Sequence, residues 1–493
     1  MSTVPFVLNK FRVIIILTVI IIIASWLRLS NIEAITTFGG DQGYDFTQIR
    51  QVVVDKNPTL LGPKIGPYTN GKSLYLGPAY YYILLPSLVL ANFDPIGPAI
   101  LTSLVSIATI ILIYLTCYKC LNPVIGLIAV AFYTFTPFLI YQSQAPSNPH
   151  LLPFFSILTI FAILDSKSHK RNTWLWPLIA GLSSGIAFQL HYLAVSLVIA
   201  CIVFLFKSRL VIFSVLGFLI SLSPQVIFEL KHDFFVTNLI FEQIFSGHNT
   251  ATLSKFFTNL ILGFQIFSKA MVPNTLSPLF LVMAICICLI VLIKKDKRRS
   301  FLISLSAFVS LAALVLASLY SGQVHVHYLA VAYPAFAILI SSTIYQLFNL
   351  SKNVIVRSVV ITIVGIMFAQ NVLAIELKQS QGYTMPTGWN LPGIREAAKI
   401  IAKDANGDFN IANTLDGDTR AMPLRYLTDV YGKTPQPVEN YSHDLSAVYV
   451  LSRDDNAKIL QYTVWEVDNY KPFVISQDWH VQNGIRVVKL ERL

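Results

Sequence analysis

The sequence predicts a polytopic α-helical membrane protein that carries a small α/β domain at its C-terminal end. Of its 493 residues, 55% are hydrophobic and only 12% are charged, about half the charged fraction of an average soluble domain. Long stretches, such as residues 120–164 and 300–351, contain no Lys, Arg, Asp or Glu. From about Glu376 the chain becomes polar and mixed in charge, which divides it into residues 1–375 and residues 376–493.

The apolar stretches of residues 1–375 accommodate about eleven membrane-spanning helices, since a span needs about 20 apolar residues and sometimes only 17. The first run follows a basic flank and lacks a small-residue cleavage site, so we expect an uncleaved span. The expected spans are residues 12–29, 98–116, 124–141, 150–165, 174–190, 192–206, 210–229, 276–293, 301–320, 327–347 and 354–374. This assignment places the short basic clusters of the chain on the cytoplasmic side.

One further apolar segment, residues 77–95, has to stay on the outer surface in this topology. Its three consecutive tyrosines and its internal Pro86 favour an interfacial helix. If the segment crossed instead, every later loop would change sides. With an interfacial helix, the first outer loop covers residues 30–97 and the C-terminal domain lies outside a plasma membrane. Most histidines and amide-rich turns then gather on the extracytoplasmic face.

Charge and cysteine content exclude two classes of function. The formal net charge of +11 is explained by basic cytoplasmic loops, so we expect no nucleic-acid partner. All five cysteines lie in or beside apolar spans, which predicts no structural disulfides. The C-x-x-C pair of Cys117 and Cys120 has no second pair, and we interpret it as structural rather than metal-binding or redox-active.

Residues 376–493 predict a small α/β domain. The stretch GIREAAKIIAKDANG has helical periodicity and ends in glycine, whereas DFNIANT, SAVYVLS and GIRVVKLER alternate as strands do. The segment DGDTR at residues 416–420 lacks the 12-residue register of a calcium-binding loop, so we expect a turn there.

Two carboxylates follow the first span directly. Residues 35–50 read ITTFGGDQGYDFTQIR, which places Asp41 and Asp45 four residues apart. On a helix this spacing puts both side chains on the same face, and the preceding glycine pair lets the loop approach a substrate closely. Asp41 also stands where the N-cap of a helix would stand, so plain capping is an alternative explanation for it.

Five short motifs occur in a defined order along residues 10–375. They are DQGYD, GPAYYYILLP, APSNPHLLPFF, FQLHYLAV and VHVHYLAVAYP. In this order they resemble the motifs of GT-C superfamily glycosyltransferases, of the protein O-mannosyltransferase and aminoarabinose (lipid A) transferase type. The sequence departs from that family at Gln42, where the family usually has Glu.

The resemblance implies a GT-C fold, with about eleven spans and a juxtamembrane helix in the first outer loop. It also implies a hexosyl- or mannosyltransferase-like enzyme that takes its sugar from a polyprenyl-phosphate donor. Lipid, glycan and protein acceptors are all open. A transporter or flippase for a lipid-linked glycan is one alternative, although nearly charge-free spans without an internal repeat speak against it. A non-catalytic membrane scaffold is another, although it would not need an acidic first loop.

The implied reaction needs one base and several groups that stabilise an anion. An acceptor hydroxyl must lose its proton as it attacks the anomeric carbon, and Asp41 is the candidate general base. The leaving phosphate ester needs cations or hydrogen-bond donors but no second carboxylic acid. The candidate supporting or acceptor-binding residues are Gln42, Asp45, Asn148, His150 and His191, with Asp45 expected to be solvent-facing or supporting. The candidate phosphate-binding residues are Arg50, Lys64, Lys72, Lys231, His232, His325 and His327. No metal-ligand set is evident, and a divalent metal stays open.

Overall fold

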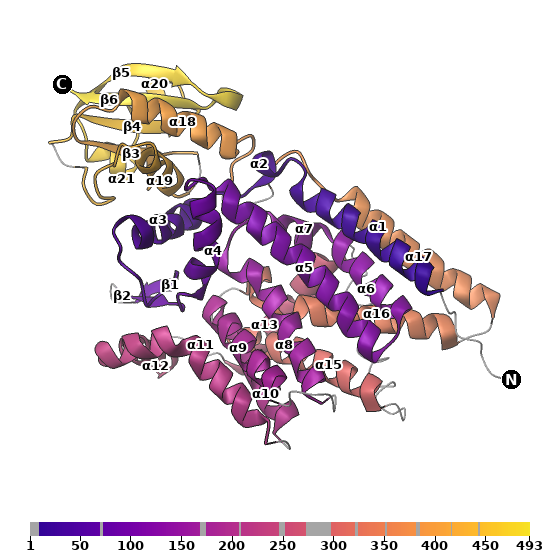
Figure 1. Ribbon diagram of the computed structural model, residues 1–493. Coiled ribbons are helices and arrows are strands. Elements are labelled where there is room, and N and C mark those ends of the chain that lie inside the picture. Colours follow the sequence, from indigo (N-terminus) through magenta and orange to yellow (C-terminus); the bar gives the residue numbers. More distant parts are fainter. Residues whose placement is uncertain are drawn as a thin grey trace.

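In a computed structural model of the chain, a bundle of long helices carries a small sheet domain at one end (Figure 1). The structure describes residues 9–69, 72–167, 174–206, 209–245, 252–272, 297–320, 324–350, 353–380, 385–415, 417–441 and 444–493. The expected polytopic helical membrane protein with a C-terminal sheet domain is confirmed.

The apolar helices of the bundle coincide with the expected spans. They are α1 (Lys10–Leu29), α5 (Ile96–Cys120), α6 (Pro123–Phe135), α7 (Pro137–Ser143), α8 (Leu152–Ser166), α9 (Leu175–Leu190), α10 (Val195–Leu205), α11 (Val211–Lys231), α15 (Lys297–Ser318), α16 (Tyr333–Leu350) and α17 (Val354–Leu373). Within the described residues, seven helical segments are long and apolar enough to cross a membrane, and the bent pair of α6 and α7 makes an eighth when it is counted as one span. Helices α9 and α10 are shorter, and the expected span 276–293 lies outside the described residues.

Five further helical segments belong to the described part of the bundle. They are η1 (Asn148–Leu151), η2 (Tyr192–Ala194), α12 (Phe235–Phe245), α13 (Leu253–Met271) and η3 (Val326–Ala332). Segments η1, η2 and η3 are single turns or short 3₁₀ runs that lead directly into α8, α10 and α16. Because η3 contacts both η1 and η2, three turns that are far apart in sequence come together at one end of the bundle.

The expected span 124–141 is broken at Pro137, where α6 and α7 meet at an angle of 69°. Proline has no N–H, so the carbonyl of Tyr133 loses its donor within the helix. The fully buried Arg28 compensates, because its guanidinium donates to Tyr133 O at 3.3 Å and to Thr134 O at 3.5 Å. A cation at the C-terminal end of α6 also suits the helix dipole. Arg28 therefore stabilises the break.

The connection from α1 to α5 contains the acidic motif. Its elements are α2 (Ile32–Ile35), α3 (Gly40–Val54), the antiparallel hairpin of β1 (Lys64–Thr69) and β2 (Lys72–Tyr75), and α4 (Ala79–Leu90). Helix α4 has 12 residues and is therefore about 18 Å long, at 1.5 Å per residue. A hydrocarbon layer of about 30 Å is too thick for it to cross, which agrees with the expected interfacial helix.

The C-terminal domain is a four-stranded mixed sheet with helices packed on it. The strands are β3 (Phe409–Asn413), β4 (Ala447–Ser452), β5 (Phe473–His480) and β6 (Arg486–Arg492), and the helices are α18 (Leu391–Asp404), α19 (Met422–Val430), α20 (Asn456–Ile459), α21 (Trp465–Asp468) and η4 (Gln482–Gly484). The strand order is β3-β4-β6-β5, with β3 parallel to β4 and the other pairs antiparallel. Every residue of β3 and β4 is buried, so both faces of these strands are covered.

This domain rests on α3, on α2 and on the loop that precedes α5 (Figure 1). Tyr426 of α19 donates a hydrogen bond to Phe93 O and packs edge-on against Phe38 and Phe46, which flank the acidic motif. Arg395 of α18 forms two hydrogen bonds to the carboxylate of Asp94, at 2.8 and 2.6 Å. The buried core continues from the helical bundle into the sheet domain, which fixes the domain against α3.

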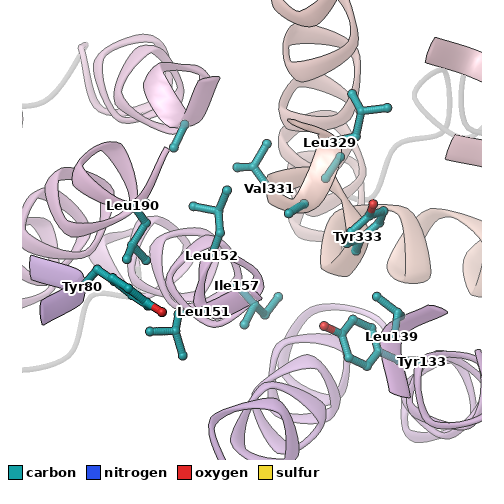
Figure 2. Close-up of a cluster of buried hydrophobic side chains, with 14 of the residues drawn as sticks. Tyr80, Tyr133, Leu139, Leu151, Leu152, Ile157, Leu190, Leu329, Val331 and Tyr333 are labelled. Atoms are coloured by element: carbon teal, nitrogen blue, oxygen red, sulfur yellow. The ribbon is translucent and has the colours of Figure 1, made fainter. Parts of the chain in front are cut away.

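Buried apolar side chains also fix the turn that follows α7. Tyr80 of α4, Leu151 of η1, Leu190 of α9 and Leu329 of η3 belong to one buried cluster (Figure 2). These four segments are therefore held together.

Candidate active site

The first turn of α3 carries the acidic motif. Gly39 is the N-cap, and the backbone N–H of Gly39 donates to Gln42 Oε1 at 3.0 Å. Asp41 lies one residue inside the helix, so the alternative in which Asp41 serves only as the N-cap is wrong. Gln42 also donates from Nε2 to Ser147 Oγ at 3.1 Å. Gln42 therefore connects the start of α3 with the turn after α7 through its side-chain amide.

Asp41 is exposed and available to a substrate. Partial desolvation by the surrounding protein raises the pKa of Asp41, Arg420 lowers it, and Asp418 raises it. A position at the N-terminal end of a helix additionally favours a negative charge. Asp41 thus combines access with an environment that makes its carboxylate a better proton acceptor than a free aspartate.

Asp45 lies one turn further along α3 and is only 6% exposed, so the expectation of a solvent-facing side chain is wrong and that of a supporting one remains. Its Oδ1 accepts a hydrogen bond of 2.8 Å from the hydroxyl of Tyr81. Burial raises the pKa of Asp45 to about 8, the Tyr81 hydrogen bond lowers it, and the charge of Asp41 raises it. At neutral pH, Asp45 is therefore mostly protonated while Asp41 is the accessible carboxylate.

Two tyrosines of α4, Tyr80 and Tyr81, lie next to these aspartates. Tyr80 donates to Pro146 O at 2.7 Å, and its ring is adjacent to that of Tyr81. Helix α4 thereby connects Asp45 with the turn after α7. The tyrosine run in the sequence indicated only an interfacial helix, because the contacts that give these side chains a place in the site cross long stretches of chain.

The expected turn residues Asn148 and His150 are held by backbone carbonyls. Asn148 Nδ2 donates to Leu190 O at 2.7 Å, and His150 Nδ1 lies 2.6 Å from Ala145 O. In this geometry both side chains stabilise the turn and connect it with the end of α9. Nearby Gln142 is 3% exposed, and neither of its side-chain amide atoms has a hydrogen-bond partner. Gln142 was not among the site residues expected from the sequence.

The structure brings the other histidines of the turns together. The rings of His191 and His327 lie 6.2 Å apart, those of His325 and His327 are stacked at 5.5 Å, and Tyr328 contacts all three. Burial lowers the pKa of His191 to about 4, so it is neutral at pH 7. Among the described residues, no three His, Cys, Asp or Glu side chains are grouped around a metal position.

The expected phosphate-binding cations do not form one cluster. Arg50 pairs with Asp429 of the C-terminal domain at 2.5 Å. Lys64 of β1 is exposed and lies 5.0 Å from the ring of Tyr44 on α3, which places it on the flank of the acidic motif.

The remaining cations lie elsewhere. Lys231 and His232 are exposed at the end of α11, where the His232 ring stacks on Phe228 at 4.1 Å. The side chain of Lys72 lies outside the described residues. Among these candidates, Arg50 belongs to α3 itself, and Lys64 contacts α3 through the ring of Tyr44.

A loop of the C-terminal domain reaches the same helix end. The expected turn in DGDTR follows β3, and its Arg420 pairs with Asp418 at 2.7 Å beside Asp41. Asp416 of this segment lies outside the described residues. The contribution of this loop was missed because more than 370 residues separate it from Asp41 and no local pattern indicates the contact.

Comparison with known proteins identifies the architecture. Residues 76–229, about a third of the chain, match the family model described as dolichyl-phosphate-mannose-protein mannosyltransferase. The fold is similar to that of ArnT from Cupriavidus metallidurans bound to undecaprenyl phosphate, with a TM-score of 0.60, 11% identity and 98% of each chain covered. No curated protein matches the sequence.

Two further solved structures share the fold. One is archaeal oligosaccharyltransferase AglB from Archaeoglobus fulgidus in complex with an inhibitory peptide and a dolichol-phosphate, with a TM-score of 0.50, 12% identity and coverage of 90% of this chain and 69% of that one. The other is arabinofuranosyltransferase AftD from Mycobacteria, with a TM-score of 0.54, 11% identity and coverage of 98% and 40%. The chain has the GT-C fold, and its resemblance to GT-C superfamily membrane glycosyltransferases is confirmed.

Proposed function

We propose that this chain is a membrane glycosyltransferase that moves a sugar from a polyprenyl-phosphate-linked donor to an acceptor hydroxyl on the extracytoplasmic face. Asp41 is its general base. The observation that carries the proposal is the unequal pair on α3, in which Asp41 is exposed and Asp45 is buried against Tyr81. Two carboxyl groups with opposite environments divide into an ionised and a neutral partner, and a direct displacement needs only one base.

The reaction is a single displacement at the anomeric carbon. The acceptor oxygen forms a bond to that carbon while its proton passes to the Asp41 carboxylate. The bond between the anomeric carbon and the phosphate oxygen breaks, and the electron pair leaves on the polyprenyl phosphate. Because attack and departure occur on opposite sides, the anomeric configuration inverts.

Asp45 supports this chemistry in its protonated form. A second negative charge one helical turn from Asp41 would repel it and raise its pKa further. The buried, neutral Asp45 instead fixes the orientation of Tyr81 and α4 through the 2.8 Å hydrogen bond. Asp41 therefore keeps a single negative charge at the place where the acceptor hydroxyl binds.

The donor phosphate requires positive charge or hydrogen-bond donors on the side opposite the base. Lys64 is the best placed of the described candidates, because it lies against α3 through Tyr44. Lys231, His232, His325 and His327 are the further candidates for this role. The bound undecaprenyl phosphate of ArnT and the dolichol-phosphate of AglB support a carrier of this class. The matched family model favours a mannose-like hexose.

The test measures release of polyprenyl phosphate from a panel of polyprenyl-phospho-sugars, with lipid, glycan and peptide acceptors offered in turn. The assay compares the wild type with Asp41→Asn and with Asp55→Asn, each with and without divalent metal. Asp55 is an exposed carboxylate at the other end of α3 and serves as the matched control. Release by the wild type and Asp55→Asn, but not by Asp41→Asn, is the expected result.

Two other results would contradict the proposal. Equal release by Asp41→Asn would remove Asp41 as the base. No release above empty membranes across the whole panel would favour the transporter or scaffold alternatives, and transfer of a labelled lipid-linked sugar across vesicles would then separate those two.

A further inference from the structure

The C-terminal domain places one short loop directly on the first turn of α3. A Cβ atom at Gly40 would collide with Asp418 Oδ2 and would lie 3.1 Å from Asp418 Cγ. The Asp418 carboxylate thus occupies the space that the missing side chain of Gly40 leaves. Since Asp41 is the next residue, the loop comes within reach of the candidate base.

Buried polar groups hold residues 418–420 of this loop in place. Arg425, 7% exposed, donates from Nε to Arg420 O at 2.6 Å. Asn413 donates from its backbone to Thr419 O at 3.0 Å and from Nδ2 to Asp418 O at 3.3 Å. The Thr419 hydroxyl donates to Glu466 Oε1 at 2.6 Å. An exposed loop with this many fixed carbonyls is preorganised rather than adaptable.

The loop presents its cation through Asp418. Arg420 donates from Nε to Asp418 Oδ1 at 2.7 Å and from Nη2 to Asp418 Oδ2 at 3.0 Å. The Arg420 side chain is 47% exposed and that of Asp418 is 22% exposed. Asp418 therefore lies against the helix end and orients the guanidinium of Arg420, which is about half-exposed and acts electrostatically on Asp41.

We infer that Arg420 is a positioning residue of the active site, supplied by the C-terminal domain, which favours the ionised form of the Asp41 carboxylate. This inference rests on the proposed function of Asp41. The groups that face Asp41 are Asp45 on its own helix, Tyr80 on α4, and Asp418 and Arg420 on the loop. Tyr80 and Asp45 are neutral at pH 7, and Asp418 disfavours a negative charge on Asp41. Arg420 is the group in this set that favours one.

The arrangement explains why an aspartate and an arginine occur together in the loop. A lone arginine on a surface loop samples many rotamers and loses entropy when it is fixed. The bidentate contact with Asp418 fixes the guanidinium before any substrate arrives. The negative charge of Asp418 offsets part of the effect of Arg420, so the net influence on Asp41 is moderate.

The test compares the wild type with Arg420→Gln, Arg420→Lys and the double variant Asp418→Asn/Arg420→Gln. Lys458→Gln is the control, because it removes an exposed cation of the same domain that also pairs with an aspartate, Asp454, at 2.9 Å. Two quantities are measured against pH: kcat/KM for polyprenyl phosphate release, and carbodiimide labelling of Asp41, which reports its protonated fraction by mass spectrometry of the peptide.

We expect Arg420→Gln to shift both curves to higher pH by about 0.5 to 1 unit. The shift should be smaller than for a buried ion pair, because the guanidinium is half-exposed and solvent screens its charge. The curves of Arg420→Lys should lie close to those of the wild type, because the positive charge is kept. The curves of the double variant should lie between those of Arg420→Gln and the wild type, and those of Lys458→Gln should match the wild type. Unchanged labelling and rate profiles in Arg420→Gln would overturn the inference. A higher KM for the acceptor at an unchanged pH profile would overturn it too, since Arg420 would then contact the acceptor.

The two readouts separate the inference from the proposed function. If no donor in the panel is used by the wild type, the proposed function fails, and the labelling curve still decides whether Arg420 controls the ionisation of Asp41. Thermal unfolding of each variant in detergent identifies any that fold poorly, and Arg420→Lys then decides in place of Arg420→Gln.

Discussion

Tyr81 and Asp45 form the contact that separates the roles of the two aspartates in the acidic motif. The Tyr81 hydroxyl donates to Asp45 Oδ1 at 2.8 Å, and both side chains are buried. Asp41, one helical turn earlier on the same helix, is exposed. The spacing of four residues would suggest two equivalent carboxylates, yet helix α4 covers one of them and leaves the other accessible.

The first prediction follows from this asymmetry. Asp45→Asn replaces a carboxyl group that is already neutral at pH 7, so we expect kcat/KM to fall no more than a few-fold. Asp41→Asn removes the base, and a general base typically contributes about 10²- to 10⁴-fold. Steady-state release of polyprenyl phosphate by the two variants checks this, and a larger loss in Asp45→Asn would reverse the assignment.

The second prediction concerns the pH dependence of stability. The pKa of Asp45 in the folded protein is raised to about 8 from an ordinary value of 3.8. The unfolded chain therefore ionises first as pH rises, and the free energy of unfolding should fall between about pH 4 and pH 8 by an amount on the order of a few kcal/mol. Below pH 4 and above pH 8 this group adds no further change.

Asp45→Asn provides the comparison for that trend. The variant should lose the part of the pH dependence that comes from residue 45, so its melting temperature in detergent should decline less between pH 5 and pH 8 than that of the wild type. Parallel curves for the two proteins would show that Asp45 is ionised in the folded state.

The features that follow from local sequence were predictable. Apolar length located the described spans, and the Asp41–Asp45 spacing predicted that both side chains start from one face of a helix. The expected strands in DFNIANT, SAVYVLS and GIRVVKLER correspond to β3, β4 and β6. Strand β5, which begins at Phe473, was missed because most of its residues are exposed and its alternation is weak.

The features that depend on contacts between distant residues were not predictable. Hydropathy averages over Pro137, so one span was expected where the chain bends and Arg28 satisfies the freed carbonyls. Arg50 looked like a phosphate ligand because its partner, Asp429, is 379 residues away. Asp418 and Arg420 reach Asp41 only because the whole C-terminal domain rests on α3.

The third prediction tests how closely that domain packs. A Cβ atom at Gly43 would lie 2.5 Å from the backbone of Met422 and Pro423, which cannot yield as a flexible side chain can. We expect Gly43→Ala to destabilise the packing of the C-terminal domain on α3 by about 1–3 kcal/mol. This loss should exceed the stabilisation of about 1 kcal/mol that Ala gives a helix relative to Gly. Gly365→Ala in α17 is the matched control, because nothing lies within 4 Å of the added atom.

The measurement is limited proteolysis of the C-terminal domain together with thermal unfolding. Gly43→Ala should release the domain sooner and lower the melting temperature, and it should also lower activity because Arg420 leaves Asp41. Identical behaviour of the Gly43 and Gly365 variants would mean that the domain contact has more freedom than its geometry indicates.

The last prediction decides the role of Arg50. Arg50 was expected to bind the donor phosphate, and in the structure its guanidinium pairs with Asp429 of α19, each side chain being 22% exposed. Its Nε is buried without a hydrogen-bond partner. If the pair serves to seat the domain, Arg50→Gln and Asp429→Asn should each lower stability by about 1 kcal/mol, and the double variant should lower it no further. Both single variants should then affect kcat/KM equally.

If Arg50 instead leaves Asp429 to bind the donor, Arg50→Gln alone should raise KM for the polyprenyl-phospho-sugar. Asp429→Asn would leave that KM unchanged or lower it, because the arginine would be released for the phosphate. Donor titrations of the three variants distinguish these outcomes, since the two roles predict opposite effects of Asp429→Asn.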